Sequence, residues 1–269
     1  MEYLIAVDLE GVHGVVGEPY KGLTSDHEEY AKAVENATDE VNEAVKALFD
    51  AGATDVYIWD CHAGKDNLDF TKIDSRAKKV FYKNDAYRMD FAKQRDFKGV
   101  VFIGYHSKEG SLKGVLAHTY NSSAIQYIKI NGQSVGEIEI DSYVLAQYKV
   151  PPLFVASDTV AIEQAKQFSS EIVTVETKIG KSRNEAIFRE KNDVLRDIYN
   201  GVKLSVKSNS KPCVTTCPLN VEIRYTRVEK AMEIYNKVRS DGAISVEYGE
   251  DAHVLQFVLQ RPNQIPTLF

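Results

Sequence analysis

The chain has 269 residues, enough for one large α/β domain or for one domain with a small appendage. It carries 33 Lys and Arg against 39 Asp and Glu, a net charge of −6, and no long basic run. We therefore expect no nucleic-acid partner and no membrane surface as a partner. No stretch approaches the roughly 20 apolar residues of a membrane span. Because the N-terminal segment also lacks the pattern of a signal peptide, we expect a cytoplasmic protein.

Short β-rich runs alternate with longer helical patterns along the first 200 residues. Apolar runs of β-forming residues predict strands at 3–7, 55–59, 100–103, 124–130 and 153–156. Helical spacing of apolar residues predicts helices at 25–49, within 134–149 after a short extended entry, and at 183–199. This alternation predicts an α/β fold with a mainly parallel or mixed central sheet flanked by helices.

The order of the predicted strands and helices changes toward the C-terminus. Strands are expected at 219–225, 243–248 and 254–259, with a helix at 227–238. The pattern predicts a smaller C-terminal α+β unit at 201–269, after a first domain at 1–200 that carries the metal-binding and catalytic residues. The C-terminal unit is either a separate domain or an integral part of the first one.

Acidic and imidazole side chains follow the predicted strands at the points where these strands end. Asp8 and Glu10 follow the apolar run 4–7, and His62 and His106 follow two later runs. In an open α/β sheet, ligands gather outside the carboxyl ends of the strands. Carboxylates and imidazoles together favour a metal site, although solvated acids and hydrogen-bonded structural histidines are the ordinary alternatives for each residue alone.

His118 is a third imidazole that could belong to this site. It ends the segment Gly114–His118 and is a candidate for a metal ligand or for an acid/base group. The unperturbed pKa of histidine lies near neutrality, which suits proton transfer. The alternative is a buried imidazole with satisfied hydrogen bonds.

Five dispersed motifs together resemble one known family. They are Val7–Gly11, Asp60–His62, Gly104–His106, Gly114–His118 and Val135–Glu137. In this order and at about these spacings, over residues 1 to about 180, the chain resembles the zinc-dependent D-aminopeptidases of the DppA type. A set of five ordered motifs is far more specific than any one of them.

The resemblance implies a site with two divalent metal ions, and zinc is the first candidate. Carboxylate and imidazole ligands also accommodate Mn²⁺ or Co²⁺. Asp8 would bridge the two metals. Glu10 and His62 would complete one ligand set, and His106 and Glu137 the other.

The resemblance further implies a metal-dependent aminopeptidase. It would hydrolyse short peptides with a free amino terminus, among them peptides of D-amino acids, with water activated by the two metals. His118 matches the family's catalytic histidine; we expect a proton carrier or oxyanion stabiliser, although the family role has been cast as a nucleophile. The resemblance also implies a homo-oligomer, such as a decameric ring that encloses its active sites.

Two other functions are compatible with parts of the sequence. A haloacid-dehalogenase-like phosphohydrolase would use Asp8 as nucleophile and Glu10 for proton transfer, but Glu10 is too long for that role and the histidines stay unexplained. A non-catalytic protein that binds metal or peptide needs the same ligands without an open metal position.

The chain departs from the family pattern beside two of these motifs. After Glu137 the family pattern has a small glycine and then Asn-Ala, whereas this chain reads Ile-Glu-Ile-Asp-Ser and has two extra acids, Glu139 and Asp141. These acids would favour a cationic substrate group if they faced the cleft; otherwise they are solvated or hydrogen-bonded at a helix start. Cys61 stands where the family often has Ser, and metal ligation by His62 is favoured over ligation by this thiol.

Overall fold

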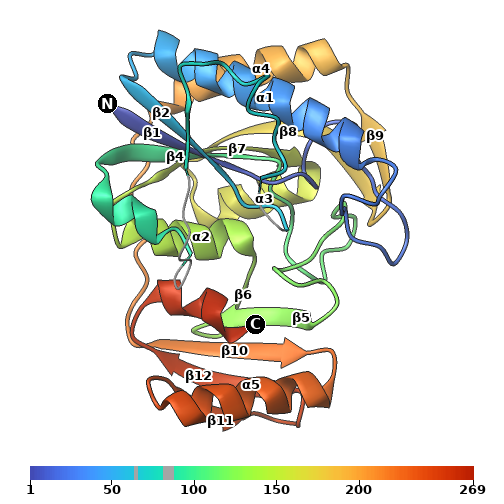
Figure 1. The fold of residues 1–269 in the computed structure, drawn as a ribbon, viewed down its shortest axis with the longest axis vertical. Coiled ribbons are helices and arrows are strands. Elements are labelled where there is room, and N and C mark those ends of the chain that lie inside the picture. The colour runs from blue at the N-terminus through green and yellow to red at the C-terminus, as the bar shows by residue number, and fades with distance from the viewer. Residues whose placement is uncertain (64–65, 81–87) are drawn as a thin grey trace.

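A seven-stranded sheet forms the centre of the molecule (Figure 1). The computed structural model describes residues 1–63, 66–80 and 88–269. The strands lie in the order β3-β2-β1-β4-β7-β8-β9, and their bounds are β1 (Glu2–Val7), β2 (Asp55–Asp60), β3 (Lys78–Lys79), β4 (Phe97–Ile103), β7 (Pro152–Asp158), β8 (Val173–Ser182) and β9 (Glu185–Phe188). All neighbouring pairs are parallel except β8 with β9. The predicted α/β fold with a mixed central sheet is therefore confirmed.

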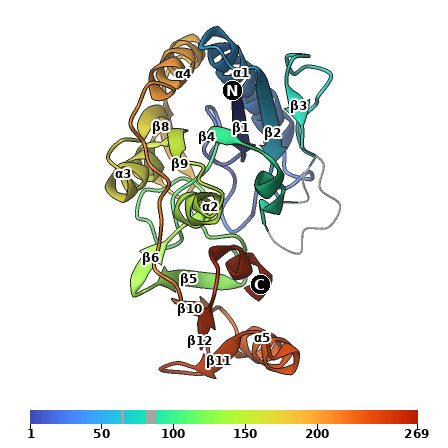
Figure 2. The same cartoon turned by 90° about the vertical axis from the view of Figure 1, so that its left-hand side faces the viewer.

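Helices cover both faces of this sheet, which explains why its inner strands are apolar on both sides. α1 (Tyr30–Asp50) and α4 (Lys191–Ser205) pack on one face. α2 (Glu137–Ala146), α3 (Thr159–Phe168) and the short helix η1 (Asp90–Gln94) pack on the other. Figure 2 shows the two layers of helices with the sheet between them.

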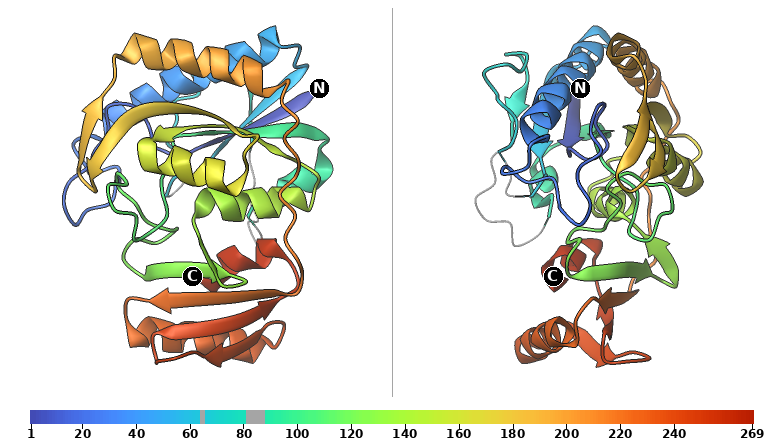
Figure 3. Two further views of the ribbon diagram at one scale, coloured as in Figure 1. Left: turned by 180° about the vertical axis from the view of Figure 1, so that it is seen from behind. Right: turned by 90° about the vertical axis from the view of Figure 1, so that its right-hand side faces the viewer.

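A second, antiparallel sheet lies at one end of the molecule (Figure 3). Its strands, in the order β11-β12-β10-β5-β6, are β5 (Ile125–Ile130), β6 (Gln133–Val135), β10 (Leu219–Tyr225), β11 (Ser245–Tyr248) and β12 (Val254–Leu259). Two further helices, α5 (Val228–Asp241) and η2 (Pro262–Leu268), share its apolar core. This sheet combines strands from before and after residue 200, and the division of the chain at that residue stays a prediction.

The order of the central strands locates the crevice in which ligands bind in such sheets. From β1, the chain places β2 and β3 on one side, whereas β4, β7 and β8 lie on the other. The direction of strand addition thus reverses between β1 and β4. A crevice opens at such a point, outside the carboxyl ends of the two strands.

Most predicted elements agree with the structure, but one helix was predicted too early. Residues 183–190 do not begin a helix, because 185–188 form β9, which pairs with β8 across a tight turn. Strand pairing overrides local helical spacing there, and α4 starts at Lys191. Among the helices of the described residues, none has the length and apolar character needed to cross a membrane.

Candidate metal centre

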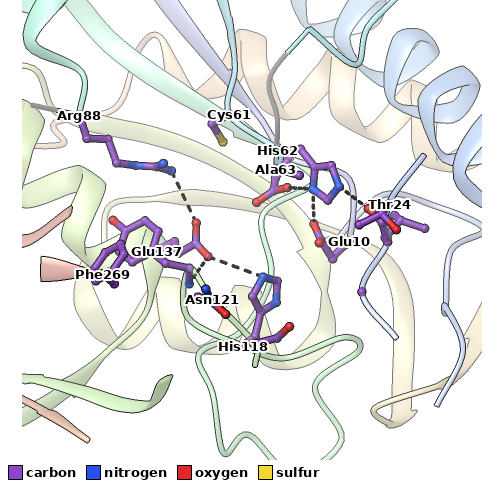
Figure 4. Close-up of a pocket in the computed structure, with 15 residues that line it drawn as sticks. Glu10, Thr24, Cys61, His62, Ala63, Arg88, His118, Asn121, Glu137 and Phe269 are labelled. Atoms are coloured by element: carbon purple, nitrogen blue, oxygen red, sulfur yellow. Dashed lines mark hydrogen bonds and ion pairs between the residues drawn. The ribbon is translucent and has the colours of Figure 1, made fainter. Parts of the chain in front are cut away.

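The five predicted ligands come together at the carboxyl ends of the central strands. Figure 4 shows Glu10, His62 and Glu137 of this set, with His118 beside Glu137. Asp8 and Glu10 follow β1, His62 follows β2, and His106 follows β4, while Glu137 is the first residue of α2. All five are at least 95% buried. Buried carboxylates and imidazoles at this density require mutual neutralisation or a metal ion.

Asp8 lies between the two halves of the cluster. Its Oδ1 is 2.8 Å from Nδ1 of His62, and its Oδ2 is 3.6 Å from Nε2 of His106. Glu10 approaches His62 at 3.2 Å, and Glu137 approaches His106 at the same distance. The two oxygens of Asp8 therefore face two separate histidine–glutamate pairs.

Each imidazole of the cluster is oriented by a backbone carbonyl on its outer side. His62 Nε2 lies 2.5 Å from the oxygen of Leu23, and His106 Nδ1 lies 3.1 Å from that of Ser107. A carbonyl can only accept, so these outer nitrogens carry the hydrogen. In the neutral ring, the inner nitrogen then presents its lone pair to the carboxylates, as in histidines that bind metals.

Some buried polar atoms of the cluster have no hydrogen-bond partner in the structure. Glu10 Oε2 and His106 Nε2 are two of them. One donor atom each from Asp8, Glu10 and His106 lie within 4.8 Å of one another, and the same holds for His106, His118 and Glu137. These two atoms have ion-pair contacts at 3.2 Å but no hydrogen bond, and a bound cation would satisfy them.

The electrostatics of the cluster favour charged side chains. Burial lowers the pKa of His62, but the carboxylates of Glu10 and Asp8 outweigh it and raise that pKa to about 12. Burial likewise lowers the pKa of His106, but the adjacent carboxylate of Glu137 outweighs it and raises that pKa to about 10. The two imidazoles in turn hold the pKa of Asp8 below its usual range against the effect of burial. Metal ions compete with protons for these same atoms.

His118 lies beside the second half of the cluster. Its ring stacks on His106 with 3.9 Å between centroids, and its Nε2 is 4.0 Å from Glu137 Oε1. Nδ1 lies 2.8 Å from the carbonyl of Leu116, so Nε2 carries the lone pair. Burial, and then the charge of His106, lower the pKa of His118, which favours the neutral ring. This nitrogen can accept a proton or coordinate a cation.

A buried lysine supports the loop that carries Glu10. Lys178, on β8, has no solvent exposure and donates to the carbonyl oxygens of Glu10, Val12 and Val15 at 2.5, 2.8 and 2.7 Å. The loop also needs Gly104, which has φ +72° and at which a Cβ would lie 2.1 Å from the oxygen of Asp8. These contacts hold the loop after β1 close to β4 and β8.

A cavity of about 530 Å³ opens over the cluster. Besides predicted ligands and His118, its walls include Leu23, Arg88, Tyr120 and Phe269, none of which the sequence analysis singled out. No local motif marks these four residues. Three lie in loops and Phe269 follows η2, and only the tertiary fold brings them to the cavity.

The acids that depart from the family pattern do not line the cavity. Glu139 accepts from the backbone of Gly136 and so caps its own helix. Asp141 is fully buried and binds Arg88 through both oxygens. Cys61 does line the cavity, but its thiol lies against the carbonyl of Val7 at 3.1 Å.

Comparisons with known proteins identify the family. A family model described as D-aminopeptidase matches residues 1–258. The D-aminopeptidase of Bacillus subtilis (strain 168) is 28% identical over 184 residues, which are 68% of this chain and 66% of that protein. The match therefore spans slightly less than two thirds of that relative's length.

A solved structure shares the fold. It is described as a zinc-dependent D-aminopeptidase DppA from Bacillus subtilis, a self-compartmentalizing protease, and it is 23% identical to this chain. The TM-score is 0.88, and the match covers 100% of this chain and 95% of that chain. The resemblance found in the five sequence motifs is thus confirmed over nearly the whole chain, and the protein belongs to the D-aminopeptidase family.

Proposed function

We propose that this protein is a metal-dependent aminopeptidase that hydrolyses short peptides with a free amino terminus, peptides of D-amino acids among them. Family membership supports the reaction class. The observation that carries the two-metal site is the position of Asp8, whose two oxygens face His62 and His106 separately. Asp8 would help to hold two divalent ions, of which zinc is the first candidate.

The carboxylates and imidazoles of the cluster suit two divalent metal ions. Glu10 and His62 would hold one ion, and His106 and Glu137 the other, each with Asp8. Two observations support this assignment: backbone carbonyls orient both imidazoles, and buried atoms of Glu10 and His106 lack a hydrogen bond. When bound, two such ions activate a water and polarise the peptide carbonyl.

The protein's own side chains orient the reaction. Glu137 Oε1 accepts from the backbone N–H of Tyr120 at 2.8 Å, which fixes its carboxylate beside His106. His118 offers a neutral Nε2 toward the same carboxylate and would take up a proton during attack or donate one to the leaving amine. The cavity above them is large enough for a short peptide.

A phosphohydrolase with Asp8 as nucleophile is the poorer fit. Both oxygens of Asp8 already face imidazoles, and Glu10 Oε2 points to His62 rather than into a phosphate site. A homo-oligomer is part of our proposal, supported by the description of the similar structure as self-compartmentalizing. The decameric ring and the cytoplasmic location stay predictions.

Peptide hydrolysis with and without metal tests the proposal. Zinc-loaded protein should release the first residue from a short D-peptide, whereas chelator-treated protein should not, and re-addition of zinc should restore the activity. Acetylation of the amino terminus should abolish cleavage, and the L-peptide of the same sequence measures stereochemical preference. Hydrolysis of a phosphate ester with phosphate trapped on Asp8, and no peptide cleavage, would reverse the assignment.

A further inference from the structure

Tyr120 connects the metal cluster to the rest of the molecule, although it is not one of the predicted ligands. Its backbone N–H donates to Glu137 Oε1 at 2.8 Å. The same carboxylate oxygen lies 3.2 Å from Nε2 of His106. The direction in which this oxygen points therefore depends on the position of the Tyr120 backbone.

The backbone of Tyr120 has an unfavourable conformation. Its φ is +57°, in the left-handed region that residues with a side chain seldom adopt. A residue other than glycine keeps such a conformation only where surrounding contacts impose it. The contacts that fix the ring of Tyr120 therefore also help to fix the N–H that donates to Glu137.

Three side chains hold the ring of Tyr120. The hydroxyl donates to Asp141 Oδ1 at 3.2 Å, and the guanidinium carbon of Arg88 lies 4.8 Å from the ring centroid. Phe269 stacks on the ring with 4.6 Å between centroids and an angle of 24° between planes. Offset stacking of this kind stabilises a ring beyond the area that it buries.

Phe269 is held in place by the second sheet. It follows η2, whose residues Ile265 and Leu268 are fully buried in the apolar core of that sheet. The hydroxyl of Tyr225, on β10, donates to the carbonyl of Leu268 at 2.7 Å. Figure 1 shows η2, in red, between α2 and the second sheet, and Figure 4 shows the Phe269 ring beside Glu137.

We propose that Phe269 is a positioning residue for the half of the metal cluster formed by His106 and Glu137. It holds the ring of Tyr120, and Tyr120 holds the carboxylate of Glu137 through its backbone N–H. Loss of a group that orients a ligand from behind typically lowers metal affinity about 10- to 100-fold. The inference rests on the proposed two-metal site, and it makes one half of that site depend on the second sheet.

The competing explanation is that the two rings only cover the apolar core of the second sheet. Both Tyr120 and Phe269 pack against that core. A covering role predicts that removal of the Phe269 ring lowers the stability of the fold and affects both metal positions alike. A positioning role predicts weaker binding at one position only.

The test measures zinc affinity separately at the two halves of the cluster, by competition with a chelator. His106→Ala removes a ligand from one half, and His62→Ala removes a ligand from the other. Phe269→Ala is then added to each of these variants. In the His62→Ala protein, which keeps His106 and Glu137, Phe269→Ala should weaken zinc binding by about tenfold or more. In the His106→Ala protein it should leave the affinity unchanged.

Two further variants define the role of the ring in the His62→Ala protein. Phe269→Tyr keeps a ring that can stack and should restore the zinc affinity. Tyr248→Ala is the matched control, because Tyr248 stacks on Tyr235 at 4.6 Å and 28° but does not line the cavity. This control should leave the zinc affinity unchanged.

Tyr120→Gly tests the path through Tyr120. Glycine keeps the N–H and adopts a positive φ without steric cost, but it has no ring for Phe269 to hold. Addition of Phe269→Ala to Tyr120→Gly should therefore cause no further loss of zinc affinity. A further loss of about tenfold would contradict the proposed path.

The outcomes separate the inference from the function on which it rests. An equal effect of Phe269→Ala on both halves, no effect on either, or the same effect in Tyr248→Ala would contradict the positioning role. Because a ligand substitution can impair folding, Phe269→Ala is also dialysed against chelator with all ligands present; it should keep one zinc ion where the wild type keeps two. If the wild type binds at most one zinc ion, the two-metal site fails and this inference fails with it.

Discussion

His118 has two ring nitrogens in different surroundings, and this difference makes its role testable. Nδ1 is bound to the carbonyl of Leu116, while Nε2 faces Glu137 at 4.0 Å. A proton carrier and a metal ligand would both use Nε2. They differ in what its removal does to the metal content of the protein.

We predict that His118→Ala lowers kcat by about 10²-fold or more and leaves the metal content nearly unchanged, because the side chain assists proton transfer or stabilises charge only as the transition state forms. Metal stoichiometry and peptide-hydrolysis kinetics are measured on the same folded preparation. His253→Ala is the control, since that imidazole also contacts a backbone carbonyl but lies in the turn before β12, away from the cavity. Loss of one metal together with activity would make His118 a ligand.

Strand β8 contributes to the site through Lys178, which binds three carbonyls of the loop after β1. Lys178→Met would leave these three oxygens without that donor in a buried place. We predict a loss of roughly 1–3 kcal/mol in the free energy of unfolding and weaker zinc binding at the Glu10 side of the cluster.

Denaturant titration and competition with a chelator measure the two effects of Lys178→Met. Lys166→Met, which removes an exposed lysine on α3, serves as the control for the change in net charge. Lys178→Arg keeps the charge and should retain part of the metal affinity. Unchanged zinc affinity in Lys178→Met would restrict this lysine to a role in stability.

Helix α1 carries a buried acid, Glu40, that makes stability depend on pH. Burial raises the pKa of Glu40 to about 8, although the backbone N–H of His13 donates to its carboxyl group. A raised pKa means that the folded state keeps a proton that the unfolded state has already released above about 4.5. The contribution of Glu40 to stability therefore falls as pH rises from about 4.5 to about 8.

We predict that Glu40→Gln stabilises the protein at pH 8 relative to the wild type, by an amount on the order of a few kcal/mol, and has little effect near pH 4.5. The amide mimics the protonated acid and has no charge to bury. Urea unfolding of both proteins across this pH range gives the difference directly. A difference that does not depend on pH would show that folding does not raise the pKa of Glu40.

At the level of the whole molecule, the proposed homo-oligomer can be tested directly. The second sheet projects from the central sheet and its helices (Figure 3), and a cavity of about 390 Å³ lies on it beside the partly exposed Val258. If ten chains of 30.2 kDa assemble as the family resemblance implies, sedimentation velocity should give a species of about 300 kDa. A species of one chain at micromolar concentration would contradict the proposed oligomer.

Local patterns of the sequence are enough to predict the fold class and the ligand set. Apolar runs without alternation predict buried parallel strands, and parallel strands end at the same edge of a sheet, so the sequence already assigns Asp8, His62 and His106 to one place. Glu137 and His118 followed from the ordered motifs of the family. In each case a local pattern carried the information.

Which residues line the cavity and which strands form the second sheet depend on long-range packing in the tertiary structure. Arg88 and Asp141 are 53 positions apart, and their pairing depends on how a loop meets α2 rather than on spacing along the chain. Strands β5 and β10 likewise pair with each other, although residues 131–218 separate them in the sequence. Long-range contacts of this kind leave no periodic or motif signal, because each partner is an ordinary residue until packing brings the two together.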